Sequence, residues 1–71
     1  MMQFEVGKTY LVNGGGAIRV IKRTSCYITF DGDFCGKRKI CRDNLFGLGE
    51  HILIPGKHIE YFCFAEHEEV K

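Results

Sequence analysis

The sequence has no long hydrophobic run. No stretch approaches the roughly 20 consecutive apolar residues that a membrane-spanning helix needs. Residues 1–5 contain no apolar signal stretch either. We therefore expect a cytoplasmic protein that contacts no membrane and keeps its four cysteines as reduced thiols.

Helical periodicity, internal repeats and linker-like segments are also missing. No window of about ten residues shows the apolar spacing of an amphipathic helix. A chain of 71 residues forms one small domain, and such a domain buries only about 60% of its unfolded surface. We assign residues 1–66 to this domain and residues 67–71 to a solvated C-terminal tail.

Glycine and other turn residues divide the chain into short segments rich in β-forming residues, a pattern typical of an all-β protein. The expected strands cover residues 9–12, 17–23, 26–30, 37–41, 51–54 and 59–65. Ile21 interrupts the alternation of the second segment. In the third, alternation predicts that Cys26, Ile28 and Phe30 point inward, whereas Tyr27 and Thr29 point outward.

The cysteine spacing gives little support for a metal site. Structural zinc sites use close pairs two to four residues apart, and Cys26, Cys35, Cys41 and Cys63 form no such pair. We expect Cys26 and Cys63 to be buried, because both lie in apolar registers, and Cys35 to be exposed in a loop. A zinc-bound domain remains a less favoured alternative.

No combination of residues indicates an enzyme. The spacing of the cysteines and histidines gives no nucleophile paired with a base, so the histidines are expected at the surface. Asp31 and Asp33 flank Gly32 as turn formers. Residues 13–16 are rich in glycine but lack the Lys-Ser/Thr of a phosphate-binding loop. We expect neither a catalytic site nor a cofactor.

The distribution of charge is the most informative feature. Residues 1–42 contain eight Lys and Arg against three Asp and Glu, whereas residues 43–71 contain two against six. Cations interleaved with an aromatic are typical of a surface that binds phosphates and stacks bases. The expected nucleic-acid-binding residues are Arg19, Lys22, Arg23, Tyr27, Lys37, Arg38, Lys39 and Arg42.

The same charges have two other interpretations. They protect an exposed strand edge and keep a small domain in solution, or they dock onto an acidic protein surface. Apolar residues late in the chain also suggest a protein interface, for a host or defence protein or for a second copy. Its candidate residues are Leu45, Phe46, Leu48, Ile59 and Tyr61.

Three segments, FEVGKTY at 4–10, VIKRTSCYITF at 20–30 and GKRKI at 36–40, carry a resemblance to a known group. They are similar, in this order, to very short SH3-like β-barrel proteins encoded by phages and mobile elements of gut Firmicutes. The resemblance implies a compact barrel and an origin in a mobile element, and it brings no established activity. Small proteins of such origin often bind nucleic acid or block a host protein.

The strand pattern and this resemblance lead to one expectation for the fold. We predict an all-β, SH3-like barrel of five or six antiparallel strands, with at most one short helical turn near residues 43–47.

Overall fold

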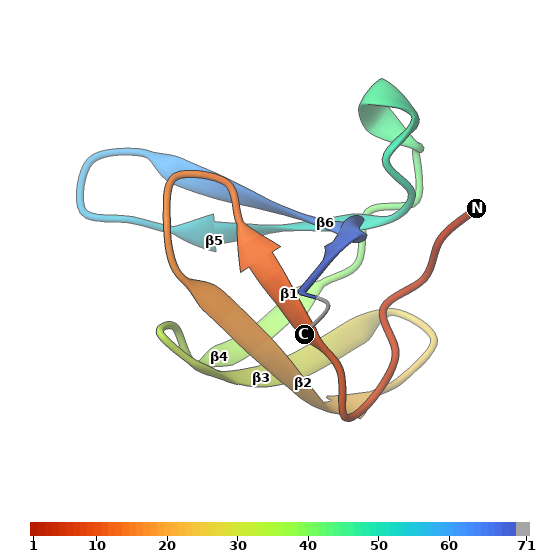
Figure 1. The fold of residues 1–71 in the computed structure, drawn as a ribbon, viewed down its shortest axis with the longest axis horizontal. Helices are drawn as coiled ribbons and strands as arrows, with labels where there is room; N and C mark the ends of the chain where they lie inside the picture. Colours follow the sequence, from red (N-terminus) through yellow and green to blue (C-terminus); the bar gives the residue numbers. More distant parts are fainter. Residues whose placement is uncertain (70–71) are drawn as a thin grey trace.

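The computed structural model describes residues 1–69, which form six antiparallel strands and one 3₁₀ turn (Figure 1). The strands are β1 (Thr9–Val12), β2 (Ala17–Arg23), β3 (Tyr27–Gly32), β4 (Gly36–Lys39), β5 (His51–Pro55) and β6 (Glu60–Glu68). The 3₁₀ turn, η1, covers Leu45–Gly47. Within residues 1–69 there is no helix with the length and apolar character required to span a bilayer.

The strands form one sheet in the order β4-β3-β2-β1-β6-β5, which curls into a nearly closed barrel. Where β4 and β5 approach each other, Cys41 and His51 exchange two backbone hydrogen bonds of 2.8 and 2.9 Å. The all-β class, the six strands and the single short helical turn confirm the expected SH3-like barrel architecture.

In β2 and β3 the core is formed by alternate residues of each strand. Ile18 and Val20 of β2, and Ile28 and Phe30 of β3, are buried, and the residues between them face outward or lie only partly covered. The N-terminal segment adds Phe4, whose ring meets Tyr10 edge-on at 4.8 Å between ring centroids. Residues from every strand except β4 join this one core.

A β-bulge in β2 explains why Ile21 breaks the alternation. Val20 lies opposite Phe30, but the next pairs are Lys22 with Thr29 and Arg23 with Ile28, so one extra residue is accommodated between Val20 and Lys22. The bulge changes which side chains face the core. Lys22 therefore lies on the outer face beside Thr29, and Arg23 lies on the inner side beside the buried Ile28.

Arg23 is thereby placed to pair with Glu50, whose side chain is only 1% exposed. The guanidinium donates through Nη1 and Nη2 to the two carboxylate oxygens, and it also donates to the Phe4 carbonyl at 2.9 Å. Glu50 Oε1 accepts the Phe4 N–H at 2.6 Å. The hydrogen bonds that Arg23 donates to Glu50 raise the pKa of Arg23. This network joins the N-terminal segment, β2 and the start of β5.

Three expectations from the sequence need correction. Cys26, expected to be buried, is exposed, because it lies in the turn before β3 and not in the strand. Its Sγ is 3.7 Å from Ser25 Oγ. The sequence also predicts Asp43 as the cap of the short helical turn, but Asn44 takes the N-cap position of η1, and its Oδ1 accepts the Gly49 N–H at 2.9 Å. The strand β6 continues to Glu68, two residues into the expected tail, and Val70 and Lys71 lie outside the described residues.

We predict that Glu50→Ala lowers the free energy of unfolding by about 3–5 kcal/mol, because it leaves Arg23 partly buried without its partner. Urea denaturation measures the change. Arg42→Ala is the matched control: Arg42 Nε is 3.8 Å from Glu50 Oε2 on a side chain that is 44% exposed, so its loss costs less than about 1 kcal/mol. Equal effects of the two variants would contradict the role given to Arg23 and Glu50.

Burial raises the pKa of the Cys63 thiol from 9.0 to about 12. The folded protein then keeps a proton that the unfolded chain loses, so the free energy of unfolding falls as the pH rises from 9.0 to about 12. Below this window the thiol adds no pH dependence. We predict that Cys63→Ala flattens this decline in alkaline denaturation curves, whereas Cys35→Ala, at an exposed thiol, leaves it unchanged. An unchanged decline in Cys63→Ala would show that the thiol is not its source.

Candidate nucleic-acid interface

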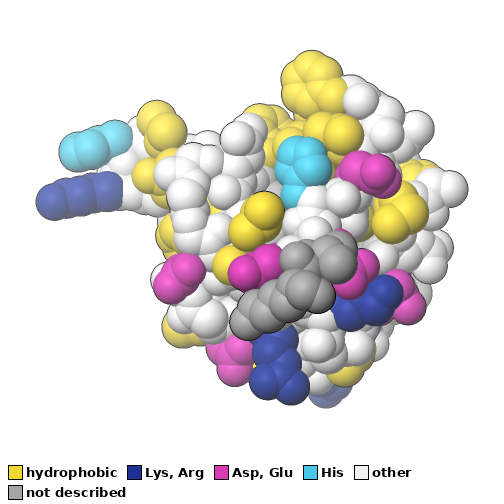
Figure 2. Space-filling model, in the orientation of Figure 1, with side chains coloured by type: hydrophobic (Ala, Val, Ile, Leu, Met, Phe, Trp, Pro, Cys, Tyr) yellow, Lys and Arg dark blue, Asp and Glu magenta, His cyan; other side chains and the backbone are white. Residues whose placement is uncertain are grey.

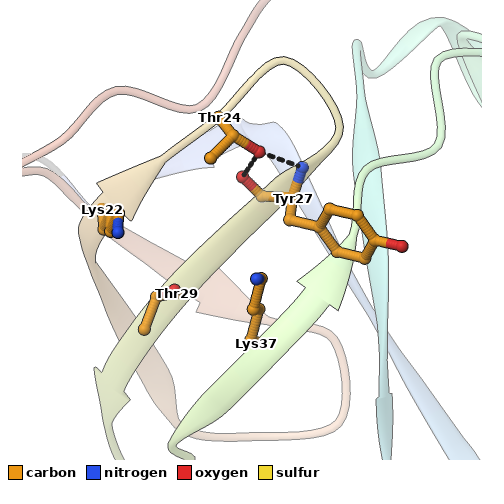
Figure 3. A pocket seen from close by; sticks show the side chains of 5 residues that line it. All are labelled: Lys22, Thr24, Tyr27, Thr29 and Lys37. Carbon is orange, nitrogen blue, oxygen red and sulfur yellow. Dashed lines mark hydrogen bonds between the residues drawn. The ribbon is translucent and has the colours of Figure 1, made fainter.

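The outer face of β2, β3 and β4 carries a row of three polar side chains. The strand register places Lys22 opposite Thr29, and Thr29 opposite Lys37. Figure 3 shows these side chains next to one another across the three strands. With Thr24 and Tyr27 they line a shallow pocket of about 40 Å³. We call these five residues the lysine pocket.

Tyr27 is held at the edge of the lysine pocket by the turn that precedes β3. Its N–H donates to Thr24 Oγ1 at 3.1 Å, and its carbonyl accepts the Thr24 N–H at 2.8 Å. The Lys37 ammonium lies 5.0 Å from the centre of the tyrosine ring, a cation–π arrangement. Tyr27 remains 42% exposed, and Lys39 lies opposite it on β4. The Lys37 ammonium therefore lies over the Tyr27 ring, while much of the ring faces solvent.

The cations on this face form no ion pair with an acidic residue in the described part of the chain. No carboxylate oxygen within residues 1–69 lies within 4.0 Å of the side-chain nitrogens of Lys22, Lys37 or Lys39. Arg19, further along β2, also forms no such pair, although Asp31 lies opposite it in the register. Four cations thus share the outer face of the sheet. Asp31 lies on the same face, next to Arg19.

Three of the predicted basic residues lie elsewhere. Arg23 is bound to Glu50, and Arg42 lies beside the same carboxylate. Arg38 points across to β5, where its Nε donates to the Leu53 carbonyl at 2.9 Å. The predicted set of eight therefore divides in two. Five members lie on the outer face: Arg19, Lys22, Tyr27, Lys37 and Lys39.

The predicted apolar interface also divides. Phe46 is 77% exposed in η1, with Leu45 and Leu48 partly buried beside it. Ile59 is 63% exposed, but it lies at the turn between β5 and β6, at the far end of that hairpin (Figure 1). Tyr61 packs against the core, with its ring centre 5.9 Å from that of Phe34. These five residues therefore form no single surface.

An aromatic cluster on the outer side of β5 and β6 was not expected. Phe62 and Phe64 stack at 5.4 Å, and His51 packs 5.5 Å from each ring. His51 is therefore buried, contrary to the expected surface position, and its Nδ1 is 3.4 Å from Asp43 Oδ1. Phe62 and Phe64 lie on one face of β6, but nothing in the sequence of η1 indicates that it places Phe46 above Phe64.

The surface around this cluster differs in charge from the lysine pocket. Figure 2 shows acidic side chains around the end of β6 and apolar side chains beyond them, toward η1. His67, exposed on β6, contacts Phe64 edge-on at 5.7 Å. The acidic residues at the end of β6 include Glu68, whose carboxylate lies 3.3 Å from Lys8 Nζ.

The structure does not gather the cysteines into one site. Cys26 and Cys35 lie in different loops, Cys41 lies beside β5, and Cys63 is buried in β6. Within residues 1–69, no three His, Cys, Asp or Glu side chains are grouped so that they could hold a metal ion.

Comparisons with protein-family models, with curated proteins and with solved structures return no match to this chain. The fold and the geometry of its surfaces are therefore the basis for the function proposed below.

Proposed function

We propose that this protein is a non-enzymatic binding module whose basic outer face contacts single-stranded RNA or DNA. The observation that carries the proposal is the lysine pocket, in which two lysines with no acidic partner among residues 1–69 lie beside an exposed tyrosine. We further propose that it acts in the cytoplasm, and its origin in a phage or mobile element stays a prediction.

The chemistry of the face suits a flexible strand. Lysine ammonium groups bind phosphates as point charges, and adjacent cross-strand positions set Lys22, Thr29 and Lys37 at intervals of about 5 Å. A base stacked on the Tyr27 ring adds about 1–3 kcal/mol, whatever its sequence. The pocket itself is shallow, so it suits one phosphate group and a neighbouring base better than an enclosed small molecule. We therefore expect binding with little sequence preference.

The double variant Lys22→Gln, Lys37→Gln tests this proposal. Binding of a fluorescent oligothymidylate is measured by anisotropy over a range of salt concentrations. Each lost phosphate contact reduces the steepness of the plot of log affinity against log salt by about 0.7 for a single strand. The slope of the double variant is therefore expected to be less steep by about 1.4. In the same assay, Tyr27→Phe keeps most of the affinity, whereas Tyr27→Ala loses the stacking contribution.

Lys57→Gln is the matched control, because Lys57 is exposed at the distant turn between β5 and β6. It removes one positive charge and leaves the lysine pocket intact. If Lys57→Gln lowers affinity as much as a single lysine change in the pocket, binding depends on net charge only. If the unchanged protein does not bind the oligothymidylate at low salt, the proposal is wrong.

A second candidate function, binding to another protein, is favoured by Phe46. This residue is the most exposed of the large apolar side chains, and its backbone has φ 58, a conformation that costs a non-glycine residue free energy. Its ring also lies 6.3 Å from Phe64, at the edge of the aromatic cluster. An exposed aromatic held in a strained turn is typical of a contact residue.

The simplest partner for Phe46 is a second copy of the chain. We predict that any self-association measured by sedimentation weakens in Phe46→Ser, because the exposed ring is its apolar anchor. Ile59→Ser is the control, since Ile59 is exposed at the opposite end of the hairpin. A protein that stays monomeric at high concentration would exclude self-association through this surface.

A further inference from the structure

The barrel opens at the seam between β4 and β5. The Cys41–His51 bridge sets a register that would continue with Lys39 opposite Leu53 and Lys37 opposite Pro55. No backbone hydrogen bond joins either pair within residues 1–69. Beyond the bridge, the one hydrogen bond across the described seam is that from Arg38 Nε to the Leu53 carbonyl.

Two residues account for the opening. Pro55 has no N–H, so a ladder between β4 and β5 would lack a donor there. The Arg38 side chain occupies the seam and takes the Leu53 carbonyl that a backbone N–H would otherwise use. The strands are therefore connected at one end and separate toward Gly36 and Pro55.

The edge of β4 that faces the seam keeps its backbone donors and acceptors. Ile40 donates its N–H to the Cys26 carbonyl, and antiparallel hydrogen bonds alternate along a strand. Arg38 and Gly36 therefore pair with β3, whereas the N–H and C=O groups of Lys37 and Lys39 point toward the seam. These four groups are arranged as the edge of a sheet that can accept another strand.

A groove of about 230 Å³ lies at the open end of the seam. Its apolar lining comes from Phe30, Phe34, Ile54 and Pro55, and Cys35, Gly36, Lys37 and Arg38 complete it. Small-molecule sites usually measure about 300–1,000 Å³, so this groove is suited to one large side chain rather than to a whole ligand. Its charged members are both cations.

We propose that the seam binds an extended segment of a partner protein, which adds to β4 as a further strand. An apolar side chain of the segment fills the groove, and an acidic side chain two residues along, on the same face of the added strand, pairs with Arg38. The apolar lining and the strand edge favour a peptide over nucleic acid, which has no main-chain amides. This site goes beyond the proposed nucleic-acid function, because it uses the edge of β4 and not the outer face.

A capped peptide of about six residues, with phenylalanine and glutamate two residues apart and threonine at the positions between them, is a direct probe. In an NMR titration, we expect it to shift the amide signals of Lys37 and Lys39. We expect Arg38→Met, which keeps the apolar stem and removes the charge, to weaken binding about tenfold. Lys22→Gln is the control: it leaves peptide binding unchanged while weakening oligonucleotide binding, so failure of one proposal is distinguishable from failure of the other.

Arg38→Met also removes the hydrogen bond to Leu53 and risks opening the seam further. A peptide with N-methylated amides avoids this problem, because it is tested on the unchanged protein. Strand addition requires these amides, so the methylated peptide should fail to bind. Equal binding of the methylated peptide, shifts confined to Lys22 and Thr29, or no binding of the first peptide would each overturn the proposal.

Discussion

A buried carboxylate holds this barrel together at the point where its N-terminal segment, β2 and β5 meet. Glu50 accepts hydrogen bonds from Arg23 and from the Phe4 backbone, and Arg23 in turn binds the Phe4 carbonyl. Taking a carboxylate out of water costs several kcal/mol unless its partners are all in place. The chain therefore adopts an arrangement in which Phe4 covers Tyr10 and the start of β5 lies beside the end of β2.

The bulge at Ile21 makes this arrangement possible and also separates the basic residues. One extra residue in β2 places Arg23 on the inner side, where it meets Glu50, and Lys22 on the outer face, where it meets Thr29. Two arginines then serve the structure: Arg23 in the buried network and Arg38 in the seam. The lysines of β2 and β4 are left for contacts outside the molecule. The bulge thus accounts for the opposite placement of Lys22 and Arg23.

Much of the fold could be predicted from the sequence, because the strands depend on local patterns. Alternation in β3 correctly placed Ile28 and Phe30 in the core and Tyr27 outside. Contacts between distant residues left no such pattern. Nothing near Arg23 shows that Glu50 will lie beside it, and nothing near His51 shows that two phenylalanines will cover it. Ile21 was the one available signal for the bulge, since an apolar residue interrupts the outward positions there. Of the eight residues predicted for the candidate site, the lysines, Arg19 and Tyr27 share the outer face, whereas Arg23, Arg38 and Arg42 lie elsewhere, and the role of all eight stays a prediction.

The central claim is that the lysine pocket, and not the side of the barrel where Arg23 and Arg42 lie beside Glu50, contacts nucleic acid. Titrating a short oligothymidylate into isotopically labelled protein and following backbone amide signals tests it most directly. The account predicts shifts at Lys22, Tyr27, Thr29 and Lys37, with Arg23, Arg42 and Glu50 unchanged. Shifts centred on Glu50 and its two arginines, with the outer face unaffected, would contradict it.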